Sequence, residues 1–178
     1  NLGRKPYSAD LPYYRDIWLN ESTARKELLV LLSRFELSDK QIKNWFDATL
    51  RNKFGYKTTD AKVLENPYII AELDEGDLEN YPIAVETIDS GLFEDKAIQG
   101  ECTPEKPQLV ESPLDQRRIR AIITQILKRS AENGDTLLSV TEITESVNTL
   151  NLQRTTVLPV NYIATNSNFI KEELNYID

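Results

Sequence analysis

The sequence predicts a mainly α-helical protein: an N-terminal helical domain followed by a truncated winged-helix-like domain. Three observations support this prediction. Apolar residues recur every three or four positions in most segments, as they do along one face of a helix. Two capping boxes, Ser38 with Gln41 and Ser139 with Glu142, are typical of helix starts. Prolines and scattered glycines stand where the helical patterns end.

The first twenty residues differ from the rest, because they combine two prolines with four aromatic side chains. We expect them to form an extended arm that packs its aromatic residues on the body of the protein. A helix is then predicted from Ser22. Its apolar face consists of Leu28, Leu29, Leu32 and Phe35.

The next predicted helix begins at Ser38 and ends at Gly55, which suits the left-handed stop of a helix. A short helix is expected after Thr59, ending before Pro67 because proline disfavours helix in the preceding residue. Two further short helices start at prolines, over residues 67–73 and 82–91.

Residues 99–113 hold three prolines and little periodicity. This composition indicates a linker, and we place the domain boundary there. The predicted units are therefore an N-terminal helical domain (1–98), a Pro-rich acidic linker (99–112) and a winged-helix-like domain (113–178).

The third unit begins with a strong helical pattern that Asp115 caps and Gly134 ends. A short extended piece, the helix capped by Ser139 and a short helix after Pro159 follow. The last residues, 168–178, are expected to form either a helix or the first strand of a hairpin. That order matches a winged helix whose wing is incomplete. The isoleucine stripe of the first helix consists of Ile119, Ile122, Ile123, Ile126 and Leu127.

Composition excludes several kinds of chemistry. The chain has no histidine, so a Ser-His-Asp triad and His-ligated zinc are ruled out. No G-x-x-x-x-G-K-S/T or G-x-G-x-x-G sequence is present to hold a nucleotide phosphate. We therefore expect no enzymatic activity, no catalytic residue, no metal and no cofactor in this chain.

Other features concern the location of the protein. The single cysteine and the absence of a long apolar run or a signal peptide favour a cytoplasmic protein without membrane contact. The absence of methionine suggests a fragment of a longer protein.

The charge is unevenly distributed. Residues 67–112 hold 12 acidic and 2 basic residues, whereas residues 1–66 hold 9 acidic and 12 basic residues. The acidic cluster at residues 74–79 does not match a calcium-binding loop, and we interpret it as a solvated turn.

Three arginines, Arg117, Arg118 and Arg120, open the helix after Asp115, where the helix dipole normally favours acidic residues. On a helical wheel Arg117 and Lys128 lie opposite the isoleucine stripe, and Arg118 and Arg120 flank it, so these residues would form a basic ridge along an exposed face. Contact with DNA phosphates is one explanation. Pairing with acidic neighbours is the other explanation, and clusters of like charges on a helix more often have this role. The acidic neighbours considered are Glu105, Glu111 and Asp115.

A second basic cluster lies between residues 40 and 57, interleaved with aromatic residues, a combination that binds single strands. Trp45, however, falls on the apolar face of its helix and is expected in the core. The Asn66-Pro67-Tyr68 turn is interpreted as structural, with Asn66 as its cap. The candidate DNA-binding residues are Arg117, Arg120, Lys128, Lys40, Lys43, Arg51 and Lys53.

Three stretches in order, "ARKELLVLLSRFELSDKQI", "LENPYIIAEL" and "DQRRIRAIITQILKRSAENGDTLLSVTEI", resemble the region ahead of the motor in RecD-like ATP-dependent DNA helicases, a family of AAA-type ATPases. The resemblance covers residues 24–178 with gaps. It implies a parent protein that uses ATP and Mg²⁺, with a motor domain in cis and DNA as its partner. One departure is that the family's "G-I-G-F"-type hairpin is replaced here by an acidic stretch without G-x-G.

From this resemblance we expect a non-catalytic accessory fragment that positions DNA or a partner beside the motor. A protein–protein interaction module using the acidic middle segment is the first alternative. The second is a winged-helix DNA-binding regulator. Its recognition helix, "VTEITESVNTL", carries two glutamates and no Lys or Arg, which suits DNA poorly.

Overall fold

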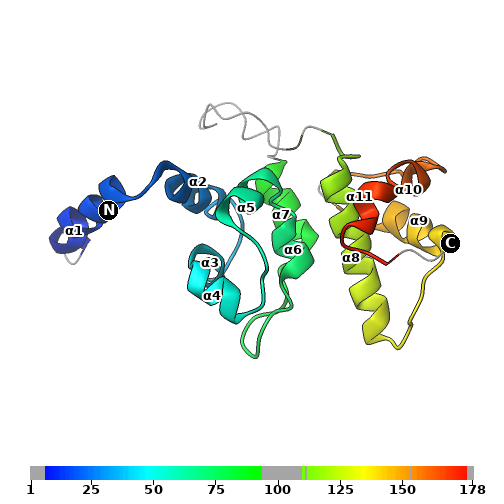
Figure 1. Cartoon of the computed structure of the whole chain (residues 1–178), viewed down its shortest axis with the longest axis horizontal. Helices are drawn as coiled ribbons and strands as arrows, with labels where there is room; N and C mark the ends of the chain where they lie inside the picture. The colour runs from blue at the N-terminus through cyan, green and yellow to red at the C-terminus, as the bar shows by residue number, and fades with distance from the viewer. Residues whose placement is uncertain (1–6, 94–109, 111, 153, 176–178) are drawn as a thin grey trace.

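A computed structural model of the chain describes residues 7–93, 110, 112–152 and 154–175, with side chains from residue 10 onward. This part of the chain is mainly helical and contains no β-strand, which confirms the expected mainly α class. Figure 1 shows the helices arranged along one long axis, with the first helix at one end and the last three helices toward the other.

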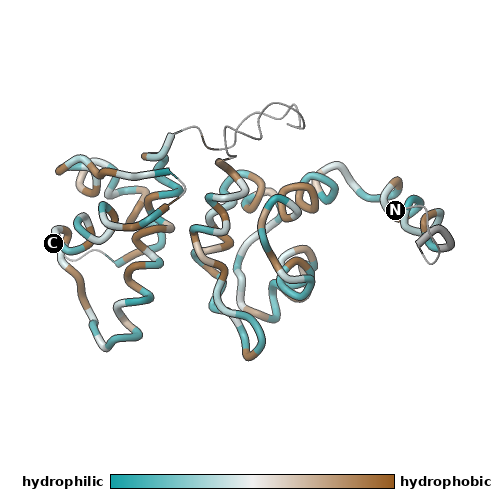
Figure 2. Tube along the Cα trace, turned by 180° about the vertical axis from the view of Figure 1, so that it is seen from behind, coloured by the Kyte–Doolittle hydropathy of each residue, from teal (hydrophilic) through white to brown (hydrophobic). Residues whose placement is uncertain are grey.

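The first helix, α1 (Tyr7–Asn20), corrects the prediction of an extended arm. Pro12 lies inside it and removes only one backbone hydrogen bond, so the flanking residues remain helical. The helix also does not pack its aromatic side chains on the body. It lies apart from the other helices in Figures 1 and 2. The six large apolar side chains that the structure describes in α1 are between 41% and 65% exposed: Leu11, Tyr13, Tyr14, Ile17, Trp18 and Leu19.

The following helices agree with the sequence except at two points. The helix expected to start at Pro82 begins only at Val85, whose N–H donates to the Gln125 side chain. The predicted helix between Ser38 and Gly55 is divided in two at Asp47. The Asp47 carboxylate accepts hydrogen bonds from the backbone N–H groups of Thr49 and Leu50, at 2.7 and 3.3 Å, and so caps a new helix. The helices of this part are α2 (Thr23–Leu32), α3 (Asp39–Phe46), α4 (Ala48–Lys53) and α5 (Asp60–Glu65).

Two short helices, α6 (Ile69–Leu73) and α7 (Val85–Leu92), complete this half of the molecule. Its core contains Trp45, which is fully buried, as the sequence predicted. The indole stacks on the Tyr56 ring with centroids 4.5 Å apart, and its N–H donates to the Asp74 carboxylate at 2.9 Å.

The second half is built on the long helix α8 (Gln116–Glu132), capped by Asp115 and followed by Gly134 at a φ of 97°. Its isoleucine face packs against α9 (Val140–Thr149) and α11 (Ser167–Lys171), with α10 (Tyr162–Thr165) beside them. The expected capping box at Ser139 is confirmed. Of the two options for the last residues, the helix is present over Ser167–Lys171.

The long helix α8 also packs against α6 and α7, on the face away from the isoleucines. It therefore lies between the helices of the two predicted domains, as Figure 1 shows. The predicted linker falls outside the described residues except for residues 110 and 112, and Val110 is buried.

Candidate functional site

The basic face of α8 is not exposed, which corrects the prediction of a solvent-facing basic ridge. Arg118 has an exposed fraction of 0% and Arg120 of 4%, while the Arg117 side chain is 25% exposed. The physical reason is that α6 and α7 cover this face of α8 and supply acidic partners for its arginines. Burial of a charge is costly unless it is paired and hydrogen-bonded, so each partner matters.

The guanidinium of Arg118 uses all five of its N–H donors inside the protein. It forms a two-pronged ion pair with Asp89, with N–O distances of 2.9, 3.1 and 2.6 Å. Its other donors reach the carbonyls of Pro113 and Arg154 and the hydroxyl of Thr156. Such bidentate pairs are stronger than neutral hydrogen bonds and fix the orientation of both side chains.

Arg120 pairs with Glu72 of α6 in the same two-pronged way, at 2.8 and 3.1 Å. It also donates to Glu172 beyond α11, at 3.3 Å, and its guanidinium lies 4.1 Å from the ring centre of Phe169. This arginine therefore connects α6, α8 and the last described helix.

Arg117 forms an ion pair with Asp115 at 2.6 Å and donates to the Glu65 carbonyl at 2.6 Å. Burial raises the pKa of the Asp115 carboxyl, but the bonds from Arg117 outweigh this effect and hold the pKa below its ordinary value. Asp115 is one of the partners considered from the sequence. The other two, Glu105 and Glu111, lie outside the described residues.

The C-terminal half of α8 makes further contacts with the same neighbours. The Lys128 ammonium donates to the carbonyls of Glu72 and Asp74 at 2.8 and 3.2 Å, at the end of α6. Gln125 accepts a hydrogen bond from the Val85 N–H at 2.8 Å and donates to Glu86 at 2.8 Å. Because α7 has no side-chain cap of its own, Gln125 supplies one from α8.

The partners Asp89 and Glu72 were not identified from the sequence. Asp89 of α7 and Glu72 of α6 stand among apolar residues, at positions that the helical spacing marks as buried. An acidic residue at a buried position indicates that a basic side chain is buried beside it. Sequence alone does not pair them with a helix about 30 or 50 residues away.

The Asn66-Pro67-Tyr68 turn has the structural role expected for it. The Asn66 side chain accepts a hydrogen bond from the Tyr68 N–H at 3.2 Å, and Tyr68 is fully buried. The Tyr68 hydroxyl donates to Asp89 at 2.7 Å. Burial, followed by the neighbouring Asp89 charge, raises the pKa of Tyr68, so the hydroxyl stays protonated as a donor. The turn thus belongs to the same polar network as Arg118.

The second basic cluster is not one continuous surface. Lys40 forms ion pairs with Asp77 and Glu79, both at 3.0 Å. Arg51 is buried and pairs with Asp60. Lys43 and Lys53 are exposed and form no ion pair with any described residue.

The acidic cluster forms a turn between α6 and α7. Backbone N–H groups of this turn, first that of Glu79, and the Lys40 ammonium lower the pKa of Asp77 to about 2. Among the described residues, no group of three or more His, Cys, Asp or Glu side chains is arranged to hold a metal ion.

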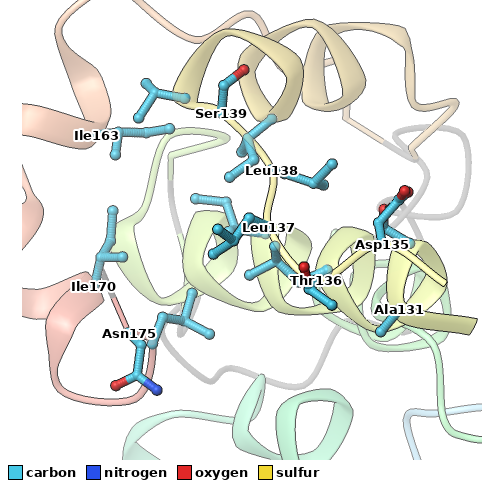
Figure 3. Close-up of a pocket in the computed structure, with 15 residues that line it drawn as sticks. Ala131, Asp135, Thr136, Leu137, Leu138, Ser139, Ile163, Ile170 and Asn175 are labelled. Carbon is cyan, nitrogen blue, oxygen red and sulfur yellow. The ribbon is translucent and has the colours of Figure 1, made fainter. Parts of the chain in front are cut away.

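A groove lies on the other side of α8, beside its isoleucine face. Its volume is about 730 Å³, within the range of ligand pockets. Figure 3 shows Leu137 and Leu138 on the connection between α8 and α9, facing Ile163 of α10 and Ile170 of α11. The polar residues Asp135, Ser139 and Asn175 lie at the edge of the groove. Leu137 is 71% exposed although it lines this apolar site.

No helix within the described residues is long and apolar enough to cross a membrane. Comparisons of the chain with protein-family models, with curated proteins and with solved structures gave no match. The candidate site is therefore defined by its geometry alone: a closed polar interface on one face of α8 and an open apolar groove beside the other.

Proposed function

We propose that this chain is a non-catalytic accessory segment of a RecD-like DNA helicase, and that it positions a partner beside the motor through protein contacts. The observation that supports this function best is the closed polar interface of α8. It ties helices from both predicted domains into one unit of defined geometry, as a positioning element requires.

The same interface argues against DNA binding by the α8 arginines. Phosphate contacts require donors that reach solvent, and each contact adds to a steep salt dependence. The donors of Arg118 and Arg120 are instead occupied by Asp89 and Glu72 in buried pairs. A phosphate would have to displace these carboxylates and leave them buried without a partner, which is costly.

The order of α8, α9, α10 and α11 along the chain supports the winged-helix-like part of the proposal, and α8 packs against both α9 and α11. In that arrangement α9 would be the recognition helix. It carries Glu142 and Glu145 and no basic residue, so the proposal assigns this unit a scaffold role rather than base recognition.

Fluorescence anisotropy tests the proposal, using the full chain with labelled single-stranded and forked DNA at low and physiological salt. We expect weak binding at low salt that the double substitution Lys43→Glu and Lys53→Glu abolishes. The control is Lys62→Glu, which alters another exposed lysine of the same half that lies outside the basic cluster. Tight binding at physiological salt would contradict the proposal.

The link to a helicase has its own test. A motor segment that carries the G-x-x-x-x-G-K-S/T phosphate loop, purified from the parent protein, is expected to co-elute with this chain in gel filtration. Separate elution of the two, with the chain folded by circular dichroism, would overturn that link.

A further inference from the structure

We infer that Asn133 is a site of spontaneous deamidation, in which the backbone nitrogen of Gly134 attacks the side-chain amide of Asn133. The product is an aspartate or an isoaspartate at the end of α8. The inference does not depend on the helicase link. It concerns the segment that ends α8 and leads to the apolar groove.

The pair Asn133-Gly134 combines the residue types that this reaction needs. Asparagine is one of the thermolabile amino acids. The attack on its side-chain amide by the next backbone nitrogen closes a five-membered ring within one molecule, so it needs no collision with a second reactant. Glycine has no Cβ to obstruct that nitrogen. Every other asparagine of the chain precedes a residue with a side chain.

The site is open to solvent. Asn133 is the C-cap of α8, and residues 131–137 are all exposed. Apart from its own chain neighbours, a Cβ added at Gly134 would have no atom within 4 Å, so no described part of the chain crowds the attacking nitrogen. By contrast, Asn44 and Asn66 are only 7% exposed. Water can therefore reach Asn133 for the second step of the reaction.

Two hydrogen bonds restrain the site. The Asn133 side-chain N–H donates to the Arg129 carbonyl at 3.1 Å, and the Gly134 backbone N–H donates to the Ala131 carbonyl at 3.0 Å. Both belong to the last turn of α8 and must break before the nitrogen can reach the amide carbon. Helix ends fray at low cost, and no side chain of residues 131–137 is buried to keep this turn closed. The reaction therefore proceeds in the folded protein through local opening of the last turn.

The atoms balance without an oxidant or a reductant. The Gly134 nitrogen loses its proton and bonds to Cγ of Asn133. The bond from Cγ to Nδ2 breaks, and the side-chain nitrogen takes up a proton and leaves as ammonia. Water then opens the five-membered imide at either of its two carbonyls, which gives aspartate or isoaspartate. Because the attacking nitrogen must lose its proton, the reaction is faster at higher pH.

Either product changes the end of α8. It places a negative charge at the negative end of the helix dipole, beside Glu132 and close in sequence to Asp135. It also removes the side-chain donor that closes the last turn. Isoaspartate adds one carbon to the main chain ahead of Leu137 and Leu138, which lie along the groove in Figure 3. Deamidation therefore loosens the last turn of α8 and alters the edge of the groove.

Mass spectrometry of the full chain, incubated at neutral and at mildly alkaline pH, tests the inference. We expect the small mass gain of an amide that becomes a carboxylic acid, located by proteolysis at Asn133 and formed faster at alkaline pH. Asn133→Gln should slow the gain at this position by at least about tenfold, because glutamine has to close a larger and less favourable ring. The matched control Asn52→Gln changes another exposed asparagine, which precedes Lys53, and should leave the gain unchanged.

Two further measurements separate this reaction from general ageing of the sample. Circular dichroism during the incubation should show that the chain stays folded, and a synthetic peptide of residues 129–137 gives the rate without the helix. A peptide that deamidates while the folded chain does not would overturn the inference, as would equal gains at several asparagines. Asn133→Asp, which mimics one product, should lower the melting temperature. An unchanged melting temperature would contradict the stated effect on α8.

Discussion

The helices α1 and α8 reverse the usual relation between side-chain polarity and burial. The long helix α8 carries three arginines in its first turns, and two of them are almost completely buried. From residue 10 onward, the helix α1 carries three aromatic residues and three large aliphatic ones, and all six are exposed. We conclude that the burial of a side chain in these two helices depends on which partners are available to it. The two buried arginines pair with acidic groups on α6 and α7, whereas the large apolar side chains of α1 are not buried against any described part of the chain.

This comparison predicts that substitutions which remove one charge from the buried ion pairs of α8 are severe and that aromatic substitutions in α1 are mild. The largest effect is expected for Asp89→Ala, because it leaves Arg118 charged and the Tyr68 hydroxyl unpaired in a buried site. Breaking one side of a buried ion pair costs about 3–5 kcal/mol. Urea unfolding followed by circular dichroism measures it.

The matched control is Asp89→Leu combined with Arg118→Met, which removes both charges. We expect the double variant to be more stable than Asp89→Ala. A loss below about 1 kcal/mol for Asp89→Ala would show that the pair is not buried as described.

Gln125→Met is expected to lower the free energy of unfolding by a smaller amount, about 1 kcal/mol, because the first N–H of α7 loses its cap. Methionine keeps the length of the side chain and removes its polar atoms. Thermal unfolding compares it with Thr124→Ala at the adjacent position, where the hydroxyl bonds only to a carbonyl of its own helix. Equal melting temperatures for the two variants would contradict a capping role for Gln125.

We expect Asp115→Asn to change the free energy of unfolding in a way that depends on pH. The substitution keeps a good N-cap residue and removes the charge. The folded protein lowers the pKa of Asp115, so its contribution is present above the unfolded pKa of about 3.9 and is lost as pH falls through the folded pKa. We expect a loss of up to about 1 kcal/mol at neutral pH, because Arg117 is partly exposed.

Urea unfolding at a series of pH values measures this dependence. The difference between the wild type and Asp115→Asn should be constant above about pH 5 and should shrink at lower pH. A difference that grows toward low pH would contradict the assigned ion pair.

The smallest effect on folding is expected in α1. Tyr14→Ser with Trp18→Ser should change the free energy of unfolding by less than about 0.5 kcal/mol, as is usual for exposed positions. A loss as large as that of Asp89→Ala would mean that α1 packs on the body after all.

Much of the fold follows from local patterns in the sequence. The capping boxes at Ser38 and Ser139 and the cap at Asp115 determine where α3, α9 and α8 begin. The Asn66 cap and the burial of Tyr68 also follow from the local pattern. These signals act within four residues along the chain, so they depend little on the rest of the structure.

Two predictions about single helices were wrong, and in both cases the reason lies in the nearby sequence. The division at Asp47 has a signal in the sequence, since aspartate is a strong N-cap, but the continuous apolar pattern across it favoured one helix. Pro12 favoured an extended arm, although a proline removes only one hydrogen bond from an otherwise helical segment.

Local sequence patterns were enough to predict the helical class and most helix starts, and the composition excludes histidine chemistry. The burial and pairing of the arginines depend on tertiary structure, because Asp89 and Glu72 reach Arg118 and Arg120 only when α6 and α7 pack on α8. Tertiary structure also decided that the aromatic residues of α1 remain exposed. The physical reason is that the free energy of a buried charge or an apolar face depends on partners distant in sequence, and residue type and spacing do not specify those partners.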